Sequence, residues 1–180
     1  MANQKLTDKT ALEEQAGSGD LLMVVDVSDT TGSAAGTSKK IDFKYVTQTD
    51  VLSYTSAQVN ALNTTPQTLV AAPGAGYIIQ PITATCICTF VSTASTLTGY
   101  LYIGYGVATG TNYWVSQRDF NKNEAASRTF IFGGSTTAPA DGTFAGTIEN
   151  GSLNMNASAD FATGDWTMKV AITYQIVKIS

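Results

Sequence analysis

The chain of 180 residues contains no histidine, only two cysteines and four prolines, and a charged fraction of just 13%. The absence of histidine excludes Ser-His-Asp and Cys-His catalytic arrangements and removes the commonest transition-metal ligand. Globular proteins are typically about one-quarter charged, whereas the apolar fraction of 43% is ordinary. The polar surface must therefore come from Thr, Ser, Asn, Gln and Gly, which favour strands, turns and loops over long helices.

Two kinds of apolar segment are also missing. No stretch approaches the roughly 18 apolar residues of a membrane span, and the opening MANQKLTDKTALEEQ lacks the apolar core of a signal peptide. The net charge of −4 gives no basic footprint for nucleic acid. We therefore expect a protein made in a cytoplasm, without membrane insertion and without a nucleic-acid partner.

Acidic residues are scarce beyond residue 50, and all of them fall in predicted loops or turns, where solvation explains them better than a catalytic pair does. They are Asp119, Glu124, Asp141, Glu149, Asp160 and Asp165. The segment from Asp119 has the alternate spacing of a calcium loop, but Glu124 stands where glycine is needed. We assign no catalytic, cofactor-binding or metal-binding residue, and we expect a protein that is not an enzyme and has no cofactor.

The two cysteines, Cys86 and Cys88, lie on a predicted strand. Alternation places both side chains on the same face, too far apart for an easy disulfide. A metal site would require further cysteine or histidine ligands. The spacing therefore predicts two buried, unreactive thiols.

Charge divides the chain, because thirteen of its twenty-four charged residues precede residue 51. We interpret residues 1–50 as an arm with a short helix over 10–19 and strands over 21–27 and 39–46. A lone hairpin is marginally stable in water, so we expect this arm to need a partner surface. Its apolar strand positions are the candidate anchor: Leu21, Leu22, Val24, Ile41, Phe43 and Tyr45. Residues 51–62 are predicted to be a connector with some helical character.

Residues 63–180 predict an antiparallel β-sandwich or jelly-roll-like domain of seven or eight short strands separated by turn signals. The clearest alternation is in the last strand, with Trp166, Met168, Val170, Ile172, Tyr174 and Ile176 on one face. Pro81 indicates an edge position or a bulge in a long strand over 77–91. We expect residues 152–159 to pair with the last strand.

Aromatic residues offer one candidate binding surface. Tyr100, Tyr102, Tyr105, Tyr113 and Trp114 could form a sugar-binding platform, although aromatics in a β-sandwich more often serve the core or a subunit interface. The loops around them suggest a second, overlapping set at loop tips: Tyr113, Trp114, Arg118 and Asn121.

Two stretches carry a family resemblance. DLLMVVDVSDTTGSAAGTSKKIDFKYV (residues 20–46) resembles the N-terminal segment of many tailed-bacteriophage fibre and head-decoration proteins. ALNTTPQTLVAAPGAGYIIQPITA (61–84) and GDWTMKVAITYQIV (164–177) resemble a β domain of phage virion structural proteins. The resemblance implies an N-terminal segment that docks on the particle, a projecting β domain and a trimeric state. It carries no catalytic motif.

These observations lead to two functional hypotheses. The first is a non-enzymatic structural component of a phage virion, a head fibre or capsid decoration, whose partners are capsid or tail proteins of the same virion and two further copies of the chain. The alternative is a receptor- or glycan-binding tip module of a tail fibre, with a host-surface glycan as partner. Both place the protein in the virion, after synthesis in the host cytoplasm.

Overall fold

The computed structural model describes residues 21–42, 45–95, 99–106, 113–118, 125–133, 148–159 and 164–180. The chain forms two compact units, Met1–Val46 and Thr47–Ser180. The short helix predicted over residues 10–19 lies outside the described residues.

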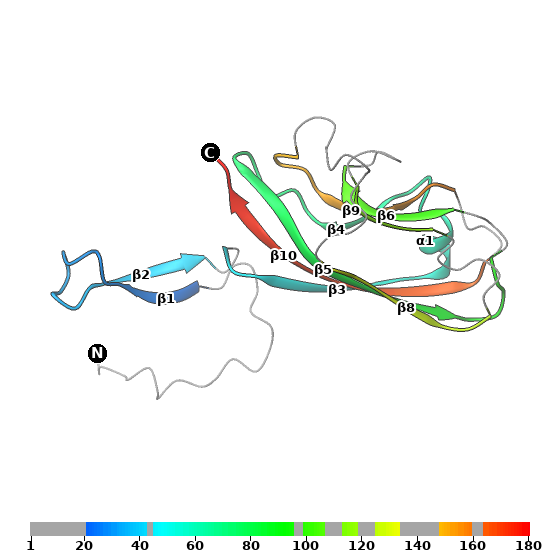
Figure 1. Cartoon of the computed structure of the whole chain (residues 1–180), viewed down its shortest axis with the longest axis horizontal. Helices are drawn as coiled ribbons and strands as arrows, with labels where there is room; N and C mark the ends of the chain where they lie inside the picture. The colour runs from blue at the N-terminus through cyan, green and yellow to red at the C-terminus, as the bar shows by residue number, and fades with distance from the viewer. Residues whose placement is uncertain are drawn as a thin grey trace. The chain divides into compact units, whose positions relative to one another are not determined.

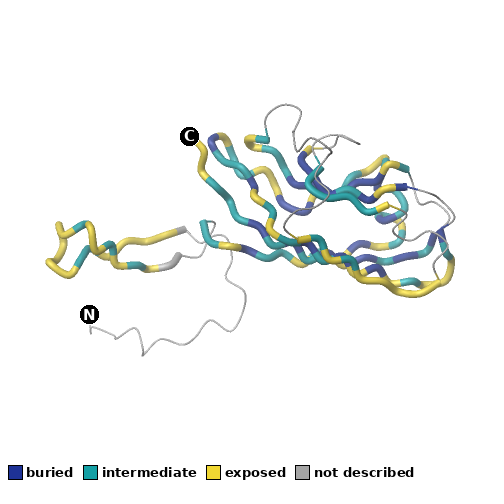
Figure 2. The backbone as a smooth tube through the Cα atoms, in the orientation of Figure 1, coloured by how far each residue is buried: buried dark blue, intermediate teal, exposed yellow. Residues whose placement is uncertain are grey.

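The first unit contains the predicted hairpin. Strands β1 (Leu21–Asp26) and β2 (Thr37–Asp42) pair antiparallel along all six residues. At the tip, the Lys39 ammonium lies 2.5 Å from the Asp29 carboxylate, and this contact lowers the pKa of Asp29 to about 2. Every residue of this unit whose burial is described is exposed or half-buried (Figure 2). The hairpin therefore has backbone pairing but no core of its own.

The second unit is an antiparallel β-sandwich, as the sequence predicts (Figure 1). One sheet has the order β3 (Gln48–Tyr54), β10 (Trp166–Lys178), β5 (Tyr77–Phe90) and β8 (Arg128–Gly133). The other has the order β4 (Gln67–Val70), β9 (Leu153–Ala157), β6 (Tyr100–Tyr105) and β7 (Tyr113–Arg118). Each sheet has four strands, and the two face each other across one core.

The strand pairs are nested along the chain. β6 pairs with β7, β5 with β8, β4 with β9 and β3 with β10, each pair enclosing the previous one. The additional pairs β5·β10 and β6·β9 join these four pairs into two sheets. The predicted pairing of residues 152–159 with the last strand is therefore wrong. β9 supplies Leu153, Met155 and Ala157 to the core from the sheet opposite β10, so the chain changes sheets between them.

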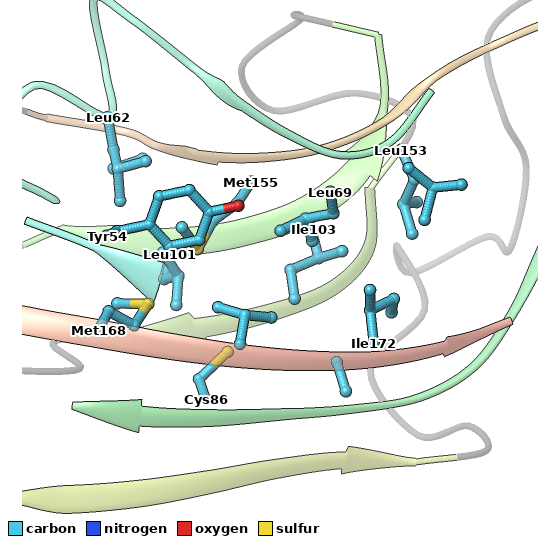
Figure 3. Close-up of a cluster of buried hydrophobic side chains, with 14 of the residues drawn as sticks. Tyr54, Leu62, Leu69, Cys86, Leu101, Ile103, Leu153, Met155, Met168 and Ile172 are labelled. Carbon is cyan, nitrogen blue, oxygen red and sulfur yellow. The ribbon is translucent and has the colours of Figure 1, made fainter. Parts of the chain in front are cut away.

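The alternation predicted for the last strand is confirmed in β10. Trp166, Met168, Val170, Ile172 and Tyr174 are buried, and Ile176 packs against the core from a partly buried position. Their partners come from both sheets, so that side chains of the two layers fill the space between them (Figure 3). Apolar burial of this kind contributes about 25 cal/mol per Å².

A β-bulge in β5 explains Pro81. Tyr174 of β10 pairs with Pro81 and Thr173 pairs with Thr83, so Ile82 has no partner in β10. The extra residue shifts the alternation, and the buried positions pass from Ile79 to Ala84. β8 pairs with β5 only over Thr83–Cys88, so the missing N–H of Pro81 lies beyond the end of that ladder.

The sandwich begins earlier than expected. Residues 48–54, assigned from sequence to the end of the arm and the start of the connector, form β3 and pair with β10. A hydrophobicity pattern does not detect this strand, because two of its inward-facing residues, Gln48 and Asp50, are polar. Both side chains accept hydrogen bonds from the Tyr174 hydroxyl at 3.0 Å.

A short helix follows β3. Helix α1 (Ser56–Asn60) begins at a capping box in which Thr55 and Gln58 satisfy each other's backbone N–H groups. Val59 and Leu62 are fully buried. The helical character predicted for this segment is therefore present, but it belongs to the folded unit and not to a connector.

The packing of β10 predicts how much a substitution on either face of the strand changes the free energy of unfolding. Ile172→Ala should lower the free energy of unfolding by about 2–5 kcal/mol, the usual range for truncating a buried isoleucine, because Ile172 is fully buried. Lys169→Ala, at an exposed position three residues away, should stay within about 0.5 kcal/mol. Urea unfolding followed by circular dichroism measures both, and similar losses for the two variants would contradict this assignment of faces.

Candidate functional site: an aromatic row and an open edge of the sandwich

Three tyrosines come together on the outer face of the second sheet. In β6, alternation turns Leu101, Ile103 and Tyr105 into the core, where all three are buried. Tyr100 and Tyr102 therefore point to the opposite face. On β7, the register places Tyr113 beside Gly104 and Arg118 beside Tyr100.

The rings of these tyrosines form a continuous row. The ring centroids of Tyr100 and Tyr102 are 5.7 Å apart with nearly parallel planes, and those of Tyr102 and Tyr113 are 5.3 Å apart with a tilt of 42°. The Arg118 guanidinium carbon lies 5.9 Å from the centroid of Tyr100, within the range of a cation–π contact. We call Tyr100, Tyr102, Tyr113 and Arg118 the tyrosine row.

Polar groups border the tyrosine row on the β9 side. Asn156 pairs with Tyr102 across the sheet, and Ser158 exchanges hydrogen bonds with the backbone of Tyr100 at 2.8 and 2.9 Å. Burial raises the pKa of Tyr102, and the neighbouring Tyr113 and Tyr100 add to the shift. The row thus combines aromatic surface, hydroxyl and amide groups and one positive charge. Such a set suits a polyhydroxylated ligand.

The structure separates the residues that the sequence groups together. Tyr113 and Arg118 belong to the tyrosine row, whereas Trp114 sits at a register shift in β7 and packs against the core. Tyr105 is buried, and its hydroxyl donates to the Ile79 carbonyl. Asn121 lies outside the described residues. The i, i+2 spacing of Tyr100 and Tyr102 is the sequence signal for a shared face.

An open cleft lies at one edge of the sandwich. It has a volume of about 330 Å³ and is lined by β7 and β8, the edge strands of the two sheets. Its lining residues are Val115, Ser116, Gln117, Thr129, Phe130, Ile131, Phe132 and Gly133. The cleft is bordered by two strand edges and contains no ionisable lining residue.

The two cysteines lie in the core, and Asp165 is engaged in hydrogen bonds. Cys86 and Cys88 are free and fully buried on the core face of β5, as predicted. Burial raises the pKa of each thiol to about 12. Asp165 accepts hydrogen bonds from the hydroxyls of Ser56 and Ser92 at 2.6 and 2.7 Å. These bonds connect Asp165 to helix α1 and to the segment after β5. Among the described residues, no group of three or more Cys, Asp or Glu could hold a metal ion.

Val24 and Ile41, two of the candidate anchor residues, lie on the same face of the hairpin. Leu21 and Leu22 lie in β1 by their backbone, Val24 is half-buried, and Ile41 is exposed in β2. Tyr45 follows the end of β2, and Phe43 lies outside the described residues. The most exposed apolar side chains among the described residues of this unit are not in the predicted set. They are Met23, Val25 and Val27, which are 71%, 58% and 75% exposed.

Comparison with known proteins gives no family. No family model matches the chain, and no curated protein is similar to it in sequence. A solved chain described as "Structure of deformed wing virus carrying the GFP gene" matches with 12% identity and a TM-score of 0.25, over 99% of this chain and 57% of that chain. The protein therefore spans a little over half the length of that viral chain. A TM-score of 0.25 does not establish a common fold. No helix in the described part of the chain has the length and apolar character needed to cross a membrane.

The buried ionisable groups predict loss of stability in alkali. Burial raises the pKa of Cys86, Cys88, Tyr54 and Tyr105 to about 12 in the folded protein, whereas these groups ionise near pH 9 to 10 when exposed. Between these values the folded state binds more protons, so stability falls as pH rises. The urea midpoint should be nearly constant from about pH 6 to 8 and decrease from about pH 9 upward. A midpoint unchanged at about pH 10.5 would contradict the burial of these groups.

Proposed function

We propose that the chain is a non-enzymatic structural component of a bacteriophage particle. Its N-terminal arm docks on the capsid or tail, and its β domain projects as a head fibre or decoration. One observation carries the proposal: the N-terminal unit is a paired hairpin whose described side chains are all exposed or half-buried, while the second unit has a full core of its own.

The arm is suited to fold against a partner. A two-stranded hairpin without a core is marginally stable by itself, and segments that gain order on binding can cover a large surface. Met23 and Val25 lie on one face of the hairpin with Ser38 and Lys40 opposite them. That face offers apolar side chains beside a positive charge, which suits a partner surface that is apolar with an acidic border.

The strand order of the β domain supports the same proposal. Two four-stranded sheets with the nested order 3-10-5-8 and 4-9-6-7 fit the connectivity of an eight-stranded jelly roll, an architecture found in viral capsid and lectin domains. The resemblance of residues 20–46, 61–84 and 164–177 to phage virion proteins is the reason for proposing a bacteriophage particle. A fold alone does not define an activity, so the arm remains the part that the experiment must test.

Introducing a charge on the exposed face of the arm should reduce attachment to the particle. We expect Val25→Asp to lower incorporation of the full chain into purified particles at least tenfold, because it places an unpaired charge in the docking surface. Ser53→Asp, at an exposed position of β3, is the matched control and should be incorporated normally. Immunoblots of particles from cells producing each variant give the ratio.

Protease sensitivity provides a second test of the same proposal. Trypsin should cleave the free protein at Lys39 or Lys40, both exposed in β2, and leave a resistant product that begins near the second unit. The same sites should be protected in the particle. Equal cleavage in both states, or equal incorporation of the Val25→Asp and Ser53→Asp variants, would overturn the role of the arm.

The tyrosine row favours glycan binding as a second candidate function. It is an accessible group of aromatic rings with Arg118 at one end and Tyr100 38% exposed, a composition that suits an acidic sugar. On a glycan array, Arg118→Ala should lose at least tenfold in affinity for any acidic glycan that the full chain binds. Arg128→Ala, another exposed arginine on a different sheet, is the control. Absence of binding by the unchanged chain would reject this candidate and leave the structural role intact.

A further inference from the structure

The four edge strands of the sandwich are not equally protected against pairing with another strand. Natural sheets protect their edges with inward-pointing charges, very short strands, bulges, prolines or lysines. β3 has Asp50 facing inward. β4 has only four residues and a register irregularity, and β7 has an irregularity at Trp114. Each of these three edges therefore has at least one protective feature.

β8 lacks these features. Its six residues pair in regular register with β5, with no bulge, and Arg128 at its first position is its one charged residue. Among the described residues, β8 pairs with β5 alone. Ile131, in the middle of the strand, is 74% exposed on the outer face. A regular, uncharged edge with a large exposed aliphatic side chain is the kind of edge that accepts a further strand.

We propose that β8 pairs antiparallel with β8 of a second copy of this chain, joining the two four-stranded sheets into one sheet of eight strands. A two-fold axis perpendicular to the sheet keeps both outer faces on the same side, because residues opposite each other in an antiparallel pair share a face. Centred on Ile131, this register places Ile131 against the partner's Ile131. Phe130 then lies opposite the partner's Phe132, and Thr129 lies opposite the partner's Gly133.

The charge pattern fits this arrangement. The paired segment Thr129–Gly133 contains no charged residue, so no like charges face each other across the axis. The outer row that continues from Ile131 into the sheet is also uncharged: Thr85 on β5, Ala171 on β10 and Val51 on β3. Placing two such edges together costs no charge desolvation.

The cleft beside β8 gives the second copy additional surface. Val115, Phe130 and Phe132 are among its lining residues, and pairing at β8 would cover this opening with the corresponding residues of the partner. A strand of six residues is about 20 Å long, so an edge contact of this kind buries on the order of a few hundred Å² per copy. Standard stable interfaces bury about 800 Å² per partner, so we expect a reversible, concentration-dependent dimer.

Sedimentation velocity of the full chain from roughly 1 to 200 µM should show a monomer–dimer equilibrium. Ile131→Lys should raise the dissociation constant at least tenfold, because it places two like charges opposite each other at the axis. Val51→Lys is the matched control, since Val51 is 66% exposed on the same outer row at the other edge of the sheet. It should dimerise like the unchanged chain. Thermal unfolding should show that both variants are folded.

A crosslink tests the register independently of stability. The Cα atoms of directly opposite residues are about 4.5–5.5 Å apart, within the 4.4–6.8 Å range that a disulfide spans. Ile131→Cys should therefore form a covalent dimer with oxidised glutathione, which takes up the two electrons and is reduced to glutathione. Val51→Cys should not form this dimer. The natural cysteines do not compete, because both are fully buried.

Each outcome decides for or against the pairing. A dimer that Ile131→Lys dissociates and Ile131→Cys crosslinks supports it. A monomer at the highest concentration, a mass of three chains as the family resemblance implies, or equal behaviour of the Ile131 and Val51 variants would overturn it. Loss of the dimer would leave the proposed docking of the arm untouched, because that proposal is tested on the particle.

Discussion

The ladder between β10 and β5 is the interaction on which the rest of the sandwich depends. It joins all thirteen residues of β10 to β5, while β3 and β8 are added on either side. Because β10 alternates without interruption, its register decides which residues of both neighbours face the core. The bulge at Ile82 lets β5 follow that register despite Pro81. Shifting β10 by one residue would turn Trp166 and Ile172 outward and Lys169 inward, which exchanges core for solvent along the whole strand.

The outer faces of the two sheets differ in chemistry because the same alternation places different residues there. On the first sheet the outer rows consist mostly of Thr, Ala, Val and Ile, with Lys169 among them. On the second sheet they contain the tyrosine row and the amides of β9. A face made mostly of uncharged side chains suits contact between protein subunits, whereas tyrosines with an arginine suit a polar ligand. We therefore propose three surfaces for recognition: the arm, the tyrosine row and the β8 edge.

Sequence reasoning was most successful where hydrophobic alternation is strong. It located β5 and β10, the face of β10 and the shared face of the two cysteines, because apolar residues at every second position allow one orientation. It missed β3, whose inward positions include the polar residues Gln48 and Asp50, both of which accept hydrogen bonds from the Tyr174 hydroxyl. It also paired β9 with the wrong strand, since adjacency along the chain does not reveal a change of sheet. The position of Trp114 depends on a bulge that no local pattern specifies.

The nested order of strand pairs has a consequence for how the sandwich forms. β6 and β7 are close in sequence, whereas Thr49 and Thr173, which share a hydrogen bond in the outermost pair, are 124 positions apart. Each pair encloses the one before it, so closure from the inside outward keeps every new loop short, and closing the outermost pair first would cost the most chain entropy. Folding dominated by such distant contacts is slow, in the range of milliseconds to seconds or longer. If β8 pairs with β5 before β3 reaches β10, newly made chains at high concentration can meet at the β8 edge while still incomplete.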